Sequence, residues 1–223
     1  MYSKKYSKAW IKSKDRNNPD TKIPNLIKSI LTENQLSKPN QIWCTDFTYL
    51  KFHGVRLYLS TFIDGFTKEI TGVHLSTKHD TNMVLTTLNQ AIQYYGEPEI
   101  IHSDQGSEYT SFEFQNTLGE YNIQSSNSAK GSPWQNGIQE SFYGKFKTEL
   151  ELDQLPRTAS YLDIYNHIIN QVDYYNNYRI HSSIENIPSE YRANFVPKSA
   201  PTECRNSRNY NLKLQDLEEN LVS

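Results

Sequence analysis

The chain has 223 residues and a mass of 26.0 kDa, which is enough for one domain with extensions but too little for two domains of ordinary size. Hydrophobic residues make up 36% and aromatic residues 13%, which argues against a chain that is disordered throughout. A formal net charge of -2 disfavours a protein that binds nucleic acid over its whole surface, and the absence of a long apolar run disfavours a membrane span or a secretory signal.

The charge is distributed unevenly along the chain. Residues 1–28 hold eight Lys or Arg and two Asp, a net charge of +6, so residues 29–223 carry -8. A basic arm on an acidic body suits contact with a polyanion at one place and with cations at another, and a solvated tail is the simpler alternative. The two cysteines, Cys44 and Cys204, form neither a disulfide framework nor a metal-binding pair, which favours a reducing, intracellular (cytoplasmic) location.

The first part of the chain predicts an arm followed by a sheet. Residues 1–38 are polar and proline-containing, so we expect a basic N-terminal arm with at most a short helix over 26–31. Beyond residue 40, β-branched and aromatic residues predominate between turn-like pairs such as His53-Gly54. This pattern predicts an antiparallel meander of three strands, over 42–50, 55–63 and 69–75.

After the meander, the apolar spacing changes to that of a helix. Val84, Leu88 and Ala91 recur at helical intervals, Asp80 or Thr81 can cap the start, and Gly96 can end the helix, whereas Asp64 is predicted as a turn residue. The remaining predicted elements are a strand over 99–102, a helix over 112–121, a strand over 122–125 and two helices over 137–152 and 161–178. Their order predicts an α/β fold with a mixed sheet and helices packed against it.

Three acidic residues occupy positions where burial is costly without a function. Asp46 lies inside the first strand, where aspartate is rare, and Asp104 ends the fourth strand, where sites in α/β sheets tend to be built. Glu140 lies about 200° around its helix from Phe142 and thus opposite the apolar stripe. Carboxylates are the ligands that Mg²⁺ prefers, and two such ions about 4 Å apart can promote phosphoryl transfer. The alternative is a set of unconnected surface acids.

The sequence around these acids carries a family resemblance. They lie in the segments WCTDFTY, HSDQGSEY and SPWQNGIQESFYGKFK, and 35 residues separate Asp104 from Glu140. These segments resemble the integrase catalytic core, and most of all the transposases of bacterial insertion sequences in the family named for insertion sequence three, whose D, D, E triad has the same gap. The segment YYNNYRIH, with Pro188 and Tyr191 after it, resembles that family's C-terminal signature, so the resemblance covers about residues 39–192.

The resemblance implies a fold, an activity and a site. The implied fold is ribonuclease H-like, a mixed five-stranded sheet flanked by helices over residues 39–192, with a C-terminal tail over 193–223. The implied catalytic residues, which would also bind Mg²⁺ or Mn²⁺ as two ions, are Asp46, Asp104 and Glu140. The implied activity is that of a DNA transposase: metal-dependent cleavage of a phosphodiester at an element end, then attack of the 3′-OH on a second phosphodiester.

Three basic residues are candidates for contact with DNA. Lys147 matches the basic residue that follows the family's Glu, Lys130 lies in the loop before that helix, and Arg179 follows the last long helix. The alternatives are a solvated helix face for Lys147 and a helix C-cap for Arg179. His102 is either a residue near the metal or an ordinary strand histidine, and we expect Gly106 to supply backbone freedom after the strand.

The resemblance also implies partners. DNA, both element ends and target, is the implied substrate, and a homo-multimer would bridge two DNA ends. Full-length family members have a helix-turn-helix region ahead of the core, and residues 1–38 show no such pattern, so we expect an upstream helix-turn-helix subunit or a truncated copy. The alternative functions are a non-catalytic DNA-binding or regulatory remnant of a transposase and a ribonuclease H-like nuclease.

Overall fold

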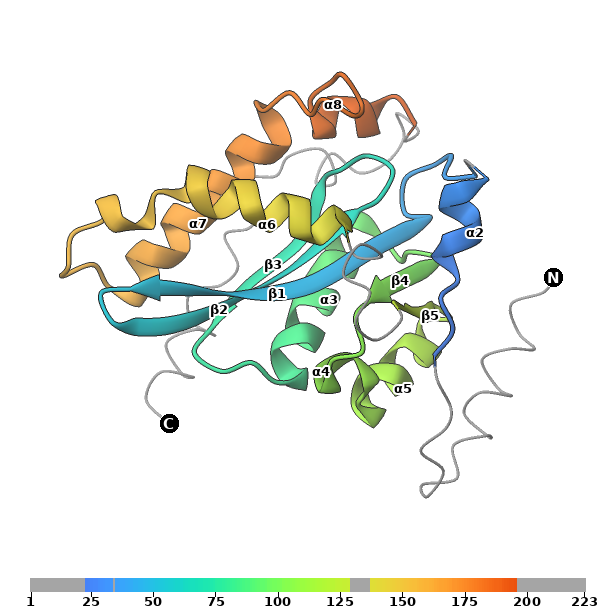
Figure 1. Ribbon diagram of the computed structural model, residues 1–223, viewed down its shortest axis with the longest axis horizontal. Coiled ribbons are helices and arrows are strands. Elements are labelled where there is room, and N and C mark those ends of the chain that lie inside the picture. The colour runs from blue at the N-terminus through green and yellow to red at the C-terminus, as the bar shows by residue number, and fades with distance from the viewer. Residues whose placement is uncertain (1–22, 34, 129–136, 196–223) are drawn as a thin grey trace.

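The computed structural model describes residues 23–33, 35–128 and 137–195 as a mixed five-stranded sheet with helices on both faces (Figure 1). Helices α6 and α7 cover one face, and α3 covers the other. The strands are β1 (Ile42–Phe52), β2 (Val55–Asp64), β3 (Ile70–Ser76), β4 (Ile100–Ser103) and β5 (Gln124–Asn127). The α-helices are α2 (Ile27–Thr32), α3 (Thr81–Tyr95), α4 (Ser107–Thr110), α5 (Phe112–Glu120), α6 (Gly137–Leu150), α7 (Tyr161–Asn177) and α8 (Pro188–Ala193), and η2 (Leu152–Gln154) is a 3-10 helix.

The sheet divides where β1 leaves β4. Strands β1, β2 and β3 are antiparallel neighbours, and β4 and β5 run parallel to β1, in the order β3-β2-β1-β4-β5. β1 is 11 residues long, but its pairing with β4 ends at Cys44, which lies opposite His102. Beyond Cys44, β1 pairs with β2 alone, while β3 follows the other side of β2 as far as Tyr58, and we call this part of β1 and β2 the β1–β2 arm (Figure 1).

Two apolar layers hold the helices on the sheet, because strand side chains alternate between its faces. Phe142, Phe146 and Leu150 of α6 pack with α7 against one face, as the predicted stripe requires. Trp43 and Phe62 face the other layer, with residues of α3 and α5. The mixed sheet and its flanking helices therefore confirm the predicted fold class. No helix in the described part of the chain is long and apolar enough to cross a bilayer.

Differences from the predicted elements lie at their ends and in short helices. The strand predicted over 122–125 is β5, two residues later, because Asn122 takes a left-handed φ of 57° in the turn after α5. Glu151, with φ 45°, ends α6 before the predicted limit. The short helices α4, η2 and α8 carry too few residues for a helical period and were not predicted.

The last part of the predicted arm packs on the body of the protein. A short helix forms where one was expected, as α2, and Ile27 is buried with Ile42 and Ile100. The Leu26 N–H donates to Ser126 Oγ at 2.9 Å, and the Asn127 N–H donates to the Pro24 carbonyl at 3.1 Å. These contacts fix the chain at the edge of the sheet formed by β5.

A buried ionic cluster ties α8 to the turn between β2 and β3. The Arg192 guanidinium lies 2.8 Å from the Asp64 carboxylate and also pairs with Glu69. Asp64 accepts hydrogen bonds from the Phe66 and Thr67 N–H groups, which confirms its prediction as a turn residue. Burial raises the pKa of Glu69 in spite of the neighbouring guanidinium. The cluster is therefore a structural one, in which one cation balances two acids.

This cluster predicts unequal effects for two arginine substitutions. Arg192→Ala leaves two buried carboxylates without their cation, so the free energy of unfolding should fall by roughly 3–5 kcal/mol. Arg179→Ala removes a partly exposed pair with Glu149, 2.9 Å apart, and should cost no more than about 1 kcal/mol. Urea denaturation of both variants measures the difference, and equal losses would contradict the structural role of Arg192.

Candidate active site

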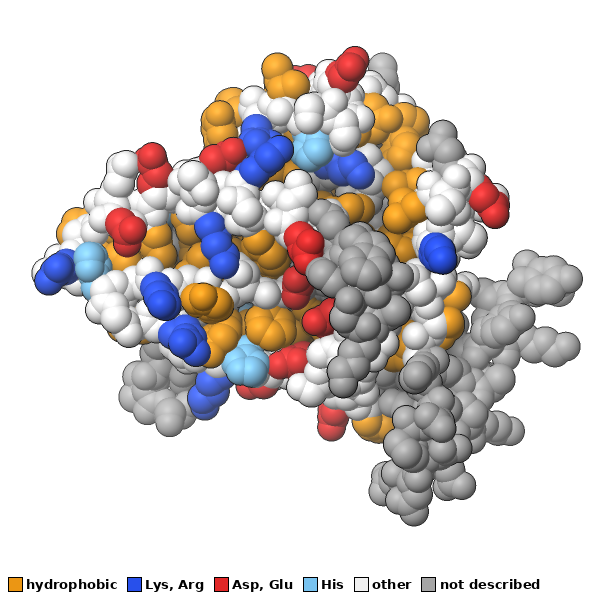
Figure 2. All heavy atoms as spheres, viewed as in Figure 1, with side chains coloured by type: hydrophobic (Ala, Val, Ile, Leu, Met, Phe, Trp, Pro, Cys, Tyr) orange, Lys and Arg blue, Asp and Glu red, His pale blue; other side chains and the backbone are white. Residues whose placement is uncertain are grey.

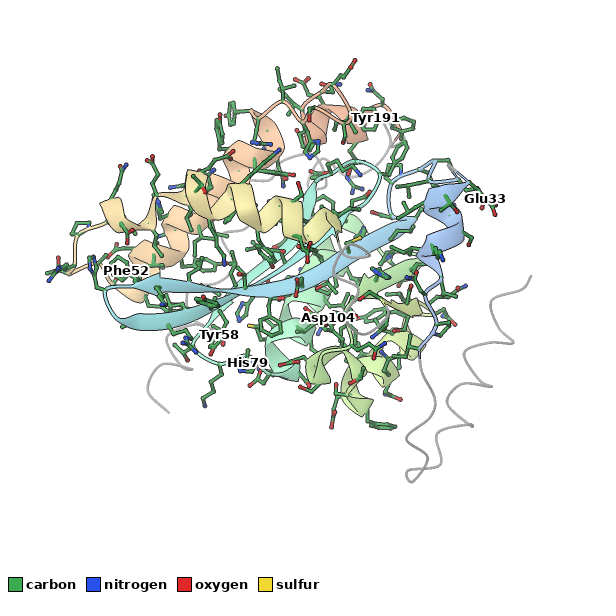
Figure 3. The ribbon with its side chains drawn as sticks, viewed as in Figure 1. Glu33, Phe52, Tyr58, His79, Asp104 and Tyr191 are labelled. Atoms are coloured by element: carbon green, nitrogen blue, oxygen red, sulfur yellow. The ribbon has the colours of Figure 1, made fainter. Side chains whose placement is uncertain are left out.

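The division of the sheet brings two of the predicted acids together. Cys44 on β1 lies opposite His102 on β4 in parallel register, and Asp46 and Asp104 each follow two residues later. Since neighbouring strands lie about 4.8 Å apart, both carboxylates start from adjacent positions at the end of the pairing. Figure 3 marks Asp104 in the region where β4 ends and α4 begins.

Helix α6 is held over the same point of β1 by neutral hydrogen bonds. The Gln139 side chain donates from Nε2 to the Cys44 carbonyl at 2.7 Å. One turn later, the Tyr143 hydroxyl donates to the Asp46 carbonyl at 2.8 Å. Glu140 lies between these two anchors on the exposed side of the helix, as predicted, and so faces away from the apolar stripe.

The charges of Asp104 and Glu140 both act on Asp46. The pKa of Asp46 is raised to about 7, first by burial and then by the negative charges of Asp104 and Glu140. The Phe47 N–H, which donates to Asp46 Oδ1 at 2.8 Å, and the positive charge of Lys147 act in the opposite direction. β1, β4 and α6 thus bring together the three acids that the sequence singled out.

The loop after β4 holds Asp104 by backbone contacts. The Gly106 N–H donates to Asp104 Oδ1 at 2.8 Å, and Asn127 on β5 donates from Nδ2 to the Asp104 carbonyl at 2.6 Å. The expected backbone freedom of Gly106 is wrong, because its φ of -57° suits any residue. A Cβ there would lie 3.0 Å from Asp104 Oδ1 and 3.1 Å from Glu108 Oε2, so any larger residue would press on both carboxylates.

Glu108 is an additional acid that sequence reasoning missed. It is buried at the start of α4, and its Oε1 lies 2.9 Å from His79 Nδ1. Burial raises its pKa, but hydrogen bonds from His79 and Ser107 outweigh that effect and hold the pKa below the ordinary value. The His79 ring stacks on Phe47, the neighbour of Asp46, at 5.5 Å between centroids. The side chains of His79 and Tyr58 lie close together, below the ribbon of β1 and β2 in the view of Figure 3. The acidic segment HSDQGSEY was a signal that could have pointed to Glu108.

The acids fit a hard divalent cation by their chemistry. In residues 23–33, 35–128 and 137–195, no three His, Cys, Asp or Glu side chains are already gathered as metal ligands. Electrostatic repulsion keeps three carboxylates apart when no cation lies between them. Mg²⁺ keeps several waters and needs only one or two carboxylates. The raised pKa of Asp46 indicates a place where added positive charge would be stabilising.

The other predicted site residues occupy different settings. Lys147 is exposed two turns along α6 from Glu140 and close enough to lower the pKa of Asp46. Arg179 pairs with Glu149 and packs over the Tyr175 ring, so its charge is partly balanced within the protein. His102 is buried and bonded to Ser126 Oγ at 2.9 Å, the setting of a strand histidine. Lys130 lies outside the described residues.

Comparisons with known proteins identify the family and the fold of the chain. Residues 37–133 match the family described as integrase core domain, and residues 121–188 match a second family with the same description. The catalytic core domain of HTLV-2 integrase, solved in complex with magnesium, is 25% identical with a TM-score of 0.57, covering 69% of this chain and 96% of that one. A simian T-cell lymphotropic virus intasome chain, 22% identical with a TM-score of 0.63, covers 74% of this chain and 57% of that one and shows likeness of fold. The fold is that of integrase cores, which are ribonuclease H-like.

Several curated relatives are transposases or transposase-like proteins. The transposase of insertion sequence element IS904 from Lactococcus lactis is 37% identical over 73% of this chain and 63% of that protein. The putative transposase InsK of IS150 from Escherichia coli is 36% identical over 70% and 56%. A transposase-like protein from Haemophilus influenzae is 35% identical over 75% and 76%. The chain belongs to the insertion-sequence transposases with an integrase core domain, and the likeness to IS150 fits the branch named for insertion sequence three. It spans about 60% of the first two relatives.

The raised pKa of Asp46 predicts how stability depends on pH. Because this pKa rises from 3.8 in the unfolded chain to about 7 in the folded one, the folded state binds more protons between these values and loses stability as pH rises across them. Asp46→Asn removes the charge and keeps an oxygen for the Phe47 N–H, so the variant should melt higher than wild type at pH 8 in EDTA. Each kcal/mol gained should raise Tm by about 2–4 °C.

Thermal melts at pH 4 and pH 8 measure this effect, with the exposed Asp153→Asn as the control. The Tm at pH 4 minus the Tm at pH 8 should be smaller in Asp46→Asn than in wild type. The same quantity should be unchanged in Asp153→Asn. An unchanged difference in both variants would contradict the raised pKa.

Proposed function

We propose that the chain is the catalytic subunit of a DNA transposase, a metal-dependent polynucleotidyl transferase that works inside the cell. The observation that supports this most directly is that the negative charges of Asp104 and Glu140, which come from separate segments, both act on Asp46. Membership of a transposase family with an integrase core supports the same reaction class.

We propose that Asp46, Asp104 and Glu140 are the catalytic residues and hold Mg²⁺ or Mn²⁺, as two ions. The HTLV-2 integrase core was solved with magnesium, and a carboxylate set of hard oxygen donors suits that ion. Bound there, such ions would lower the pKa of an attacking water and stabilise the leaving oxygen.

The reaction has two chemical steps at phosphorus. Water attacks a phosphodiester at the element end and leaves a 3′-OH, and that hydroxyl then attacks a second phosphodiester in a transesterification. The protein's part is to hold the acids in place and exclude alternative geometries, since positioning and charge stabilisation dominate phosphoryl transfer. Gln139 and Tyr143 fix α6 on β1, and the Gly106 N–H fixes Asp104.

The remaining parts receive proposed roles in binding DNA. We assign residues 39–192 to the catalytic core, residues 1–38 to a basic arm that attracts DNA, and residues 193–223 to a tail. Lys130, Lys147 and Arg179 would contact phosphate, although the pairing of Arg179 with Glu149 makes it the weakest of the three. Binding two element ends and a target would use a homo-multimer, and end recognition would come from an upstream helix-turn-helix subunit.

A strand-transfer assay tests the catalytic proposal. A labelled oligonucleotide with a free 3′-OH is incubated with Mn²⁺ or Mg²⁺ and target DNA. Asp104→Asn and Glu140→Gln should lower the rate by roughly 100-fold or more, because each removes a charge from the reacting centre. Glu113→Gln, an exposed acid on α5, should leave it unchanged.

The same assay separates the alternative functions. Absence of product from a well-folded wild-type chain, with DNA binding retained, would favour the non-catalytic remnant or a requirement for the upstream subunit. Faster cleavage of an RNA–DNA hybrid than of duplex DNA would favour the ribonuclease H-like nuclease. Activity that persists in Asp104→Asn would remove this residue from the mechanism.

A matched pair of lysines tests the proposed DNA face of α6. Lys147 and Lys145 are both exposed on this helix, but two residues apart and hence on opposite sides. Lys147→Gln should weaken duplex binding and lower the slope of log K against log salt by about 0.9, the value of one phosphate contact. Lys145→Gln should change neither, and fluorescence anisotropy over a salt series measures both. Equal effects would contradict a specific DNA face.

A further inference from the structure

The end of the β1–β2 arm carries an exposed tyrosine surrounded by cations. Tyr49 is 51% exposed. Three basic groups lie over or beside its ring, at distances from the ring centroid of 5.0 Å for Lys147 Nζ, 5.4 Å for Arg56 Cζ and 6.0 Å for Lys51 Nζ. The three come from α6, β2 and β1, so the fold assembles this cluster from separate segments.

This cluster is costly for the fold. Lys51 and Arg56 lie directly opposite each other in the antiparallel register of β1 and β2. Like charges in such cross-strand positions are destabilising, and Lys147 adds a third positive charge. The Tyr49 ring face compensates part of the repulsion, but an exposed cation–π contact is worth only about 0.5–1 kcal/mol.

The cluster forms no ion pair within the described residues. None of its three cations lies within salt-bridge distance of a carboxylate there. Figure 2 shows Lys and Arg side chains over the β1–β2 arm, beside acidic side chains over the centre of the same face. The arrangement therefore offers an anion a site with unbalanced positive charge.

The cluster is continuous with the candidate active site. Glu140, Gly144 and Lys147 follow one another on one face of α6. A Cβ on Gly144 would meet nothing within 4 Å among the described residues, so the surface of α6 is open at this position. A chain of phosphates that leaves the acids can therefore follow α6 past Gly144 toward Lys147 and Tyr49.

We propose that Tyr49, Lys51, Arg56 and Lys147 form a cradle for an unpaired stretch of a DNA strand, with one base stacked on Tyr49 and its flanking phosphates held by the three cations. An aromatic platform within a basic groove is the usual way to bind a single strand, whereas a duplex hides its base faces. This inference rests on the proposed function, since it identifies how a frayed end would be held beside the reacting acids.

Binding of fluorescent oligonucleotides in EDTA tests the cradle separately from catalysis. The probes are a single-stranded oligonucleotide and a blunt duplex of the same sequence, measured by anisotropy with the full chain. Tyr49→Ala should weaken single-strand binding roughly tenfold, the effect of losing one stacked base, and blunt-duplex binding much less. Tyr49→Phe keeps the ring and should bind like wild type.

Two further variants complete the test. Tyr178→Ala removes a tyrosine that is 65% exposed on the end of α7, and it should leave affinity unchanged. The double variant Lys51→Gln/Arg56→Gln should lower the single-strand salt slope by about 1.4, for two phosphate contacts, while thermal melts show that the fold is kept or stabilised.

The outcomes are distinguishable from failure of the proposed function. Single-strand affinity that is unchanged in Tyr49→Ala, or reduced equally in Tyr178→Ala, would overturn the cradle even if wild type performs strand transfer. An equal loss for duplex and single strand in Tyr49→Ala would also overturn it, because stacking would not be the cause. Loss confined to the single strand would support the cradle even if the strand-transfer assay gives no product.

Discussion

The early separation of β1 from β4 is the constraint on which the site depends. Pairing stops after Cys44, so Asp46 and Asp104 stand at the mouth of a divided sheet rather than in a continuous one. Continued pairing would extend the sheet and the layers that cover it past both acids, and desolvation there would oppose their charge. The division leaves room for carboxylates and, beyond them, frees β1 and β2 to form the arm. One topological feature therefore produces both the candidate active site and the surface next to it.

Two groups of buried or half-buried acids show what distinguishes a structural cluster from a functional one. Asp64 and Glu69 are balanced by the guanidinium of Arg192, and the helix that carries it closes the fold. The other group, around Asp46, has a raised pKa, and the lysine that counters it is exposed on α6. Burial therefore raises a carboxylate pKa in both groups, and the two differ in that a buried guanidinium pairs with the first.

The order of strands and long helices could be predicted from the sequence because period and turn residues are local signals. The three acids could be singled out as candidates from the sequence, because their motifs and the 35-residue gap are local features of the chain. The ends of the elements could not be predicted, because the left-handed φ of residues such as Asn122 and Glu151 depends on the turns around them. Glu108 escaped notice because its significance comes from His79, 29 residues away and brought near only by the packing of α3 and α4.

The surface of the arm was hidden from the sequence for the same reason. In the sequence, Lys51 and Arg56 are two charged residues on either side of a turn. Only the antiparallel register of β1 and β2 shows that they lie opposite each other. In the sequence, Lys147 is a lysine on the solvated face of a helix. The packing of α6 on β1 places its Nζ over the Tyr49 ring. Repulsion among these three cations opposes both the pairing of β1 with β2 and the packing of α6. A bound polyanion would remove this repulsion. The acids on the same face repel that polyanion unless divalent cations lie between them, so metal and nucleic acid would each favour binding of the other.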